Sequence, residues 1–210
     1  MENKMYSNYD INKLYQEYLD ILKPLIATIE GKYEIFPEGI LNEIRALYDH
    51  IARLSILEMS EDIKNEEFKK AIRHIHRAKL DCYKILCTMG EISIEQFEKN
   101  YKNVRLGEVD SGKFLPKYEE LKNIARNKTF KAKIEEKNIT SNEENVSILY
   151  QKAISAFENL ENFIKSNYEN LAWSVSNQKL YTKKGYIIAF ILGVIATIIG
   201  TIICKCFNIL

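Results

Sequence analysis

The chain has 210 residues, and its 30 Lys and Arg nearly balance its 29 Asp and Glu, giving a formal net charge of +1. This balance excludes a protein that relies on a strong overall positive field to attract nucleic acid. Its four cysteines lack the spacing of a disulfide framework or a zinc site. We expect no metal and no cofactor. Proline and glycine are scarce and apolar residues recur at helical spacing, which predicts an all-α protein.

Residues 1–108 are predicted to form a helical bundle. Its first helix covers Ile11–Glu30, with Pro24 expected to kink or divide it and Gly31 to end it. A second helix opens at Pro37 and continues to about Glu58.

The third helix of this bundle is predicted to begin after Asn65 as N-cap and to end near Thr88. Apolar residues lie on two adjacent rows of this helix, so it is expected to be covered on two sides as the central member of the bundle. Met89–Gly90 is predicted to break it, and a short helix over Ser93–Val104 follows.

Residues 109–140 are predicted to contain a loop and a basic helix. The loop, GEVDSG at Gly107–Gly112, is the clearest internal boundary, and Pro116 opens a helix that continues to about Lys137. Two interpretations of the basic residues remain: a solvated helix face, or contact with anionic lipid headgroups. The residues concerned are Lys122, Arg126, Lys128, Lys131 and Lys133.

A long helix is predicted over 141–185. Ser141 and Glu144 have the spacing of a capping box at its start. Apolar residues then alternate steps of four and three, the pattern of a coiled-coil or bundle seam. These residues are Val146, Tyr150, Ala153, Phe157, Leu160, Ile164, Tyr168, Leu171 and Val175, with one skip at Tyr168.

The stretch 186–204 predicts a single transmembrane helix. It contains nineteen residues without a charge, an amide or a proline. Such a helix is about 28 Å long, close to the ~30 Å hydrocarbon core of a bilayer. Lys183 and Lys184 precede it and the short tail 205–210 follows, which predicts a cytoplasmic N-terminal side. The N-terminal residues MENKMYSNYD contain no apolar run, so we expect a tail anchor rather than a signal peptide.

The smallest residues of this stretch lie on one helix face: Ala189, Gly193, Ala196 and Gly200. Small residues let helices approach closely in a membrane, where hydrophobicity cannot drive association. We therefore expect a homo-oligomer, with the lipid bilayer as the second partner. The alternative is that these residues only dilute an isoleucine-rich anchor.

Motifs for catalysis or phosphate binding are absent from the sequence: it has no glycine-rich phosphate loop, no H-E-x-x-H and no C-x-x-C. Arg73, His74 and Arg77 form a basic face on the third helix, the candidate site for a nucleotide or RNA. A salt-bridged surface is the alternative. His74 and His76 diverge by about 200° on a helix, so they cannot share one metal ion.

Arg45-Ala-Leu-Tyr-Asp-His50 spells R-x4-H within a predicted small helical bundle. In this the chain resembles the HEPN superfamily of helical domains, common in prokaryotic toxin–antitoxin and antiphage systems. The resemblance covers about residues 8–108. It implies a metal-independent endoribonuclease in which His50 acts as acid or base on a ribose hydroxyl and Arg45 holds the phosphate. On an unbroken helix the two side chains are about 140° apart, which argues against their convergence in one subunit.

These features predict a single-pass membrane protein with a cytoplasmic helical domain on a helical stalk. We expect it to act without catalysis, as a sensor, adaptor or effector that self-associates, in bacterial defence or stress. The defence setting rests on the HEPN resemblance and on architecture. Two alternatives remain: a membrane-tethered HEPN-type ribonuclease, and an oligomeric effector that perturbs the membrane.

Overall fold

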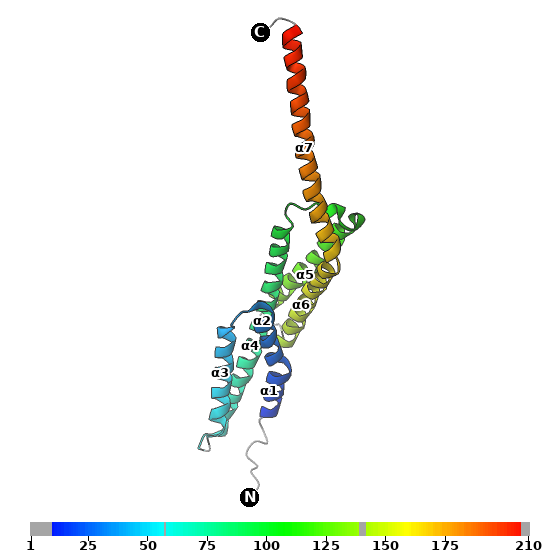
Figure 1. Ribbon diagram of the computed structural model, residues 1–210. Helices are drawn as coiled ribbons and strands as arrows, with labels where there is room; N and C mark the ends of the chain where they lie inside the picture. Colours follow the sequence, from blue (N-terminus) through cyan, green and yellow to red (C-terminus); the bar gives the residue numbers. More distant parts are fainter. Residues whose placement is uncertain (1–9, 57, 139–141, 207–210) are drawn as a thin grey trace. The chain divides into compact units, whose positions relative to one another are not determined.

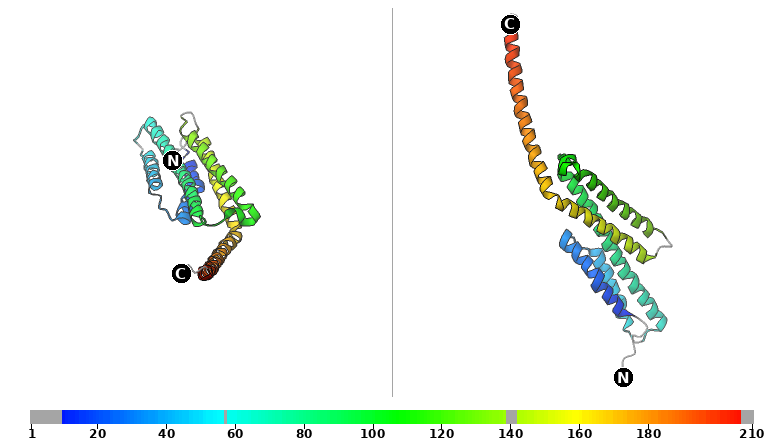
Figure 2. Two further views of the ribbon diagram at one scale, coloured as in Figure 1. Left: turned by 90° about the horizontal axis from the view of Figure 1, so that it is seen from above. Right: turned by 90° about the vertical axis from the view of Figure 1, so that its right-hand side faces the viewer.

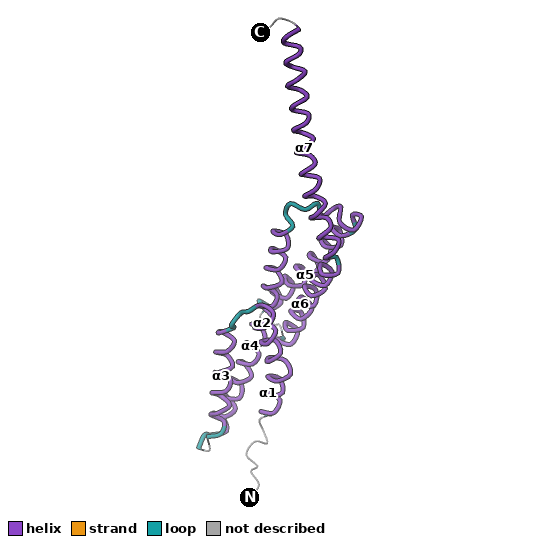
Figure 3. Tube along the Cα trace, in the orientation of Figure 1, coloured by secondary structure: helices purple, strands orange, loops and turns teal. Residues whose placement is uncertain are grey.

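The computed structural model describes residues 10–56, 58–138 and 142–206; in the last range it describes the side chains of 142–178 and 183–196. Every regular element in these ranges is helical, which confirms the all-α prediction (Figure 3). The elements labelled in Figure 1 are α1 Ile11–Glu17, α2 Lys23–Tyr33, α3 Glu38–Leu54, α4 Glu61–Asn100, α5 Phe114–Glu136, α6 Glu143–Ser166 and α7 Tyr168–Cys206. A π-helical turn, Tyr18–Leu22, joins α1 to α2, and a 3-10 segment, Leu106–Gly112, precedes α5.

The chain divides into two compact units. The first comprises Met1–Phe97 and Glu120–Glu161, and the second comprises Glu98–Glu119 and Asn162–Leu210. The unit boundaries therefore fall inside α4, α5 and α6, and the predicted boundary near residue 108 lies within the second unit.

Pro24 divides the first predicted helix, as expected. Because proline has no N–H, the carbonyl four residues before it loses its helical donor. The chain widens there into the π-helical turn, in which the N–H of Lys23 reaches the carbonyl of Tyr18. The expected stop at Gly31 is wrong: α2 continues to Tyr33, and Glu34 takes the left-handed conformation that ends it, with φ of 55°.

α3 follows the prediction at its start and α4 does not. Pro37 directly precedes α3, and the buried residues of this helix are Ile40, Leu47 and Leu54. α4 begins at Glu61, four residues before the predicted N-cap Asn65. The carbonyl of Ser60 accepts from the N–H of Lys64 at 3.1 Å, so a serine opens this helix instead.

The predicted break at Met89–Gly90 is also wrong, because α4 continues through it to Asn100. The short helix expected over Ser93–Val104 is part of α4 as far as Asn100, and its last four residues are not helical. Gly90 is buried, and a Cβ atom placed on it would lie 2.5 Å from the ring of Phe157 on α6. Glycine is needed at this position for close packing between two helices, and it does not end the helix.

The core of the first unit is built around α4, which confirms its predicted central place. α1, α2, α3 and α4 contribute side chains to one cluster, and Figures 1 and 2 show these helices side by side. The buried members are Leu14, Leu22, Ile26, Ile29, Ile40, Leu47, Ala71, Ile75, Ala78, Cys82 and Leu86. The α6 seam is buried in the same unit from Val146 to Leu160.

α5 and α6 begin differently from the prediction. α5 starts at Phe114, so Pro116 is its third residue, where a missing N–H costs nothing because first-turn N–H groups have no partner inside the helix. Ser141 of the predicted capping box lies outside the described residues. The side chain of Asn142 accepts from the N–H of Glu144 at 3.0 Å and caps α6.

The second unit has an aromatic core of its own. Phe114 is fully buried and stacks on Phe163, with ring centroids 5.2 Å apart. The hydroxyl of Tyr118 bonds to Glu98 at 3.1 Å. The predicted GEVDSG loop is irregular: Asp110, Ser111 and Gly112 all have positive φ, at 49°, 54° and 86°.

The helix predicted over 141–185 is divided at Asn167, between α6 and α7. The Ser166 hydroxyl and the Asn167 amide both donate to the carbonyl of Phe163, at 2.9 and 3.0 Å. Side-chain bonds of this kind compete with the helical hydrogen bonds and end α6. Tyr168, where the heptad pattern skips, is 66% exposed.

Within the described residues, no helix is long and apolar enough to cross a membrane. The side chains of 197–206 are not described, and this range includes the end of the predicted span, Gly200 and the last two cysteines.

Candidate functional site

A groove in the first unit, of about 980 Å³, is the candidate functional site. It lies between α1 with its π-helical turn, the middle of α4, and the start of α6. The residues on its walls are mainly polar: Lys13, Gln16, Glu17, Asp20, Ile21, His76, Lys79, Tyr83, Asn142, Glu143, Glu144, Ser147, Ile148 and Gln151.

α4 forms the floor of the groove with His76, Lys79 and Tyr83. Their spacing of three and four residues places them on one face of the helix. The walls follow the same rule, since α6 contributes Ser147 and Gln151, four residues apart. Helical periodicity places the polar groups of each helix on one face. Packing of the three segments then brings these faces together around the groove.

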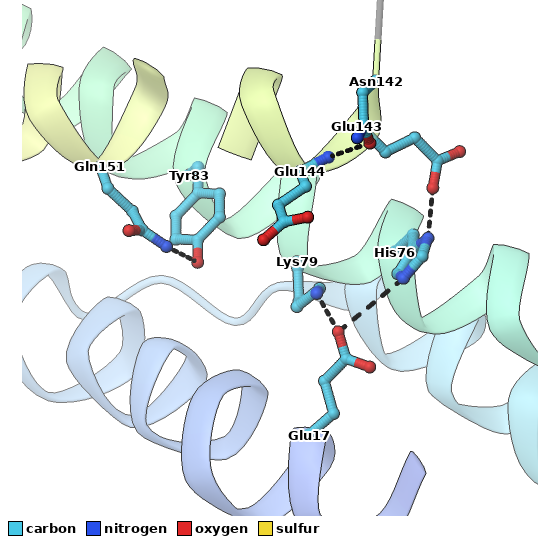
Figure 4. Close-up of polar contacts among 8 residues, drawn as sticks. All are labelled: Glu17, His76, Lys79, Tyr83, Asn142, Glu143, Glu144 and Gln151. Atoms are coloured by element: carbon cyan, nitrogen blue, oxygen red, sulfur yellow. Dashed lines mark hydrogen bonds and ion pairs between the residues drawn. The ribbon is translucent and has the colours of Figure 1, made fainter. Parts of the chain in front are cut away.

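Two side chains of α4 bind the same carboxylate on α1 (Figure 4). Lys79 donates from Nζ to Glu17 Oε1, and His76 Nε2 lies 3.9 Å from the same oxygen. The other ring nitrogen of His76 contacts Glu143 Oε2 on α6. His76 therefore links α1, α4 and α6.

The far end of the groove is neutral. Gln151 on α6 donates to the hydroxyl of Tyr83 at 2.7 Å (Figure 4). Burial raises the pKa of Tyr83, so this phenol stays protonated near neutral pH.

Over the whole lining, four carboxylates face two lysines and one histidine, so the groove favours cationic groups.

A second polar cluster joins α3 to α4 around the buried side chain of Glu67. Lys70 and His50 each approach its carboxylate to 2.7 Å, and Arg53 to 3.3 Å. The hydrogen bond from Lys70, followed by that with His50, lowers the pKa of Glu67 from 4.5 to about 2. This carboxylate is ionised at every physiological pH and neutralises the basic groups around it.

The structure separates the two residues of the R-x4-H motif. His50 faces α4, where it bonds to Glu67 and its ring stacks on His74 at 5.1 Å between centroids. Arg45, on the same regular helix, is exposed to solvent. Within one chain these two side chains therefore have different surroundings.

Two residues of the basic ligand site predicted on α4 contact a glutamate of α3. His74 Nδ1 lies 2.7 Å from Glu43 Oε2, and Arg77 lies 3.9 Å from the same oxygen. Arg73 is exposed. His74 and His76 contact different helices, as expected from their angle on α4. No group of His, Cys, Asp or Glu among the described residues has the arrangement to hold a metal ion.

Sequence reasoning missed the groove. The spacing of His76, Lys79 and Tyr83 was a usable signal, because it places three polar groups on one face of a helix that is otherwise core-forming. Their partners on α1 and α6 are more than 60 residues away in sequence, and no local pattern joins them.

Comparison of the chain with protein-family models, with curated proteins and with solved structures finds no match.

Proposed function

We propose that this protein is a membrane-anchored helical sensor, adaptor or effector that acts by self-association and without catalysis. One observation carries the proposal: large apolar side chains surround α7 between residues 186 and 195, and all of them are exposed. They are Tyr186, Ile187, Ile188, Phe190, Ile191, Leu192, Val194 and Ile195, each at least 43% exposed.

A bilayer is the cover that fits this surface. A helix that packs against a soluble partner keeps one polar face, and this stretch has apolar side chains on all sides. The uncharged run extends to residue 204 and has lysines before and after it, at 183, 184 and 205. Lysine at both ends of an apolar run is typical of a helix that ends in headgroups, and the larger cluster favours a cytoplasmic first unit.

Two features of the first unit support a non-enzymatic role. Its three histidines contact carboxylates of other helices: His50 with Glu67, His74 with Glu43, and His76 with Glu143. They are thereby used as structural links. Its two described cysteines are buried, and burial raises the pKa of Cys82 to about 12 and of Cys87 to about 11, which makes both poor nucleophiles.

We place the contact between copies on α7, and not along the whole seam predicted from Val146 to Val175. The seam residues from Val146 to Leu160 are already buried inside the first unit, and the helix is divided at Asn167. The small residues Ala189, Gly193 and Ala196 are exposed on α7, and small residues of this kind allow close contact between helices in a membrane. Bacterial defence or stress is the setting that the HEPN resemblance suggests.

The test is made on full-length protein in membranes. Alkaline extraction should leave it in the pellet, and a protease added to the cytoplasmic side should digest the first unit. Disulfide crosslinking through Cys204 should give a dimer, which Gly193→Ile with Gly200→Ile should weaken. The matched control on the bulky face, Ile191→Leu with Ile198→Leu, should leave the yield unchanged. Extraction into the supernatant would refute the anchor, and equal crosslinking in both variants would refute the association face.

The ribonuclease alternative is tested with the same preparation. We expect His50→Ala to leave the biological activity of a folded protein intact, because this imidazole is already bonded to Glu67. RNA cleavage that is abolished by His50→Ala in a folded protein would replace the present proposal with the HEPN-type enzyme.

A further inference from the structure

The second half of α5 presents exposed apolar side chains beside lysines. Phe130 is 64% exposed and Ile134 is 53% exposed, and their spacing of four residues makes them neighbours on one helix face. The opposite face of this helix is buried through Ala125, Thr129 and Ala132. Together the two side chains form a small apolar patch on the outer face of α5.

Positive charge borders this apolar pair. Lys131 lies on one side, Lys133 lies on the other, and Lys137 follows one turn later; all three are exposed. From 122 to 137 the sequence has six basic and two acidic residues. Glu136 is directed inward to Lys84 and Tyr150, at 3.0 and 2.6 Å, so its charge is used within the fold.

We propose that this face of α5 binds the surface of an anionic membrane, with Phe130 and Ile134 in the headgroup region and the lysines at the lipid phosphates. The combination matches an interfacial helix, in which apolar side chains enter the acyl boundary and lysines extend to anionic headgroups. It fits nucleic acid less well, because isoleucine offers neither a stacking surface nor a hydrogen bond to a base. The proposal deepens the proposed function and rests on it in placing the chain at a bilayer.

The experiment uses a single tryptophan in the full-length chain. Trp173, the natural tryptophan, is replaced by Phe, and Phe130→Trp supplies the α5 reporter. The protein is reconstituted into vesicles with brominated acyl chains, either zwitterionic or containing ~30 mol% phosphatidylglycerol as the anionic lipid. We expect the emission of the α5 reporter to shift to the blue and to be quenched in the anionic vesicles only.

Two controls sharpen the result. Phe36→Trp in the same background places the indole at another exposed aromatic position, 74% exposed in the α2–α3 connection, and should not be quenched. Lys131→Gln with Lys133→Gln should weaken the membrane contact of the α5 reporter about thirtyfold, since each lysine near an anionic surface contributes a factor of about five to binding.

The outcomes separate this proposal from the anchor. Retention of the protein in carbonate-washed vesicles with an unquenched α5 reporter refutes the α5 contact and leaves the anchor standing. Release by carbonate refutes the anchor, whereas selective quenching of the α5 reporter by anionic vesicles would still support the α5 contact. Equal quenching in both lipid mixtures, or displacement of the α5 reporter from the vesicles by single-stranded RNA, would overturn the proposal.

Discussion

α4 and α7 are nearly equal in length, 40 and 39 residues. They differ in an unexpected way: the charged helix is the buried one, and the uncharged stretch is exposed. α4 has charged residues along its whole length, and two of them, Lys64 and Glu67, are buried with its apolar side chains. α7 has no charge between 186 and 204, yet its described side chains from 183 to 196 are all exposed. Whether a side chain is buried in this chain therefore depends on the helices packed around it, and not on how apolar its own helix is.

The largest expected effect compares a buried with an exposed isoleucine. Ile75 on α4 is fully buried in the core, so Ile75→Ala should lower the free energy of unfolding by about 3 kcal/mol. Ile191 on α7 is half exposed, and Ile191→Ala should change it by less than about 0.5 kcal/mol. Urea titration of the full chain in mild detergent, followed by circular dichroism, measures both. Equal losses would show that the α7 side chain is packed like a core residue.

The next effect concerns the buried charge of α4. Glu67→Gln should cost about 2 kcal/mol at neutral pH, because hydrogen bonds to a carboxylate are lost from a buried site. The folded chain holds the pKa of Glu67 at about 2 instead of 4.5. Its contribution is thus complete above pH 4.5 and is lost as the pH falls through 2.

Unfolding titrations of parent and Glu67→Gln across that acid range should therefore converge. The neighbouring Glu66→Gln is the control, since its ion pair with Lys69 is exposed and should contribute nothing measurable. A constant difference between parent and Glu67→Gln down to the acid limit would contradict the assigned pKa shift.

Replacement of glycine by alanine should have a smaller effect on stability, destabilising at one position and stabilising at another. Gly90→Ala introduces a Cβ against Phe157 and should cost about 1 kcal/mol, the overpacking strain less the gain in helix propensity. Gly31→Ala in α2 meets nothing within 4 Å and should add up to about 1 kcal/mol. Thermal unfolding of the two variants gives the comparison. Stabilisation by both would mean that Phe157 moves away without cost.

The last prediction is the absence of a reaction. Cys82 and Cys87 on α4 are buried with pKa values raised by burial to about 12 and 11, so little thiolate forms at mildly alkaline pH. Iodoacetamide should leave both unlabelled in the folded protein and should label both after denaturation. Peptide mass spectrometry reads each site separately. Rapid labelling of folded protein would show that α4 is not stably covered.

Sequence reasoning located most of the helices because their apolar residues recur at helical spacing. It was wrong where the same residue type can have two structural roles, as glycine can break a helix or allow close packing between helices. Gly90 was expected to break a helix, since nothing local indicates that Phe157, 67 residues later, packs on it. The division at Asn167 was also missed, although its signal was local: a Ser-Asn pair whose side chains bind the preceding carbonyl.

The candidate groove was less predictable than the fold. His76, Lys79 and Tyr83 share a helix face that the sequence reveals, but Glu17, Glu143 and Gln151 become their partners only after three segments pack together. Arg45 and His50 show the reverse: a motif adjacent in sequence whose members have different surroundings in the structure.

The division of the first unit between Met1–Phe97 and Glu120–Glu161 has a consequence for synthesis on the ribosome. After Phe97 is made, 64 more residues must follow before Glu161 completes the first unit. At about 5–20 residues per second this delay lasts several seconds. During that time the surface of α4 around Gly90 lacks Phe157 and is open to chaperones or to other nascent chains. α4 is thus complete before α6, the helix that covers Gly90, and the apolar run 186–204 is synthesised after both.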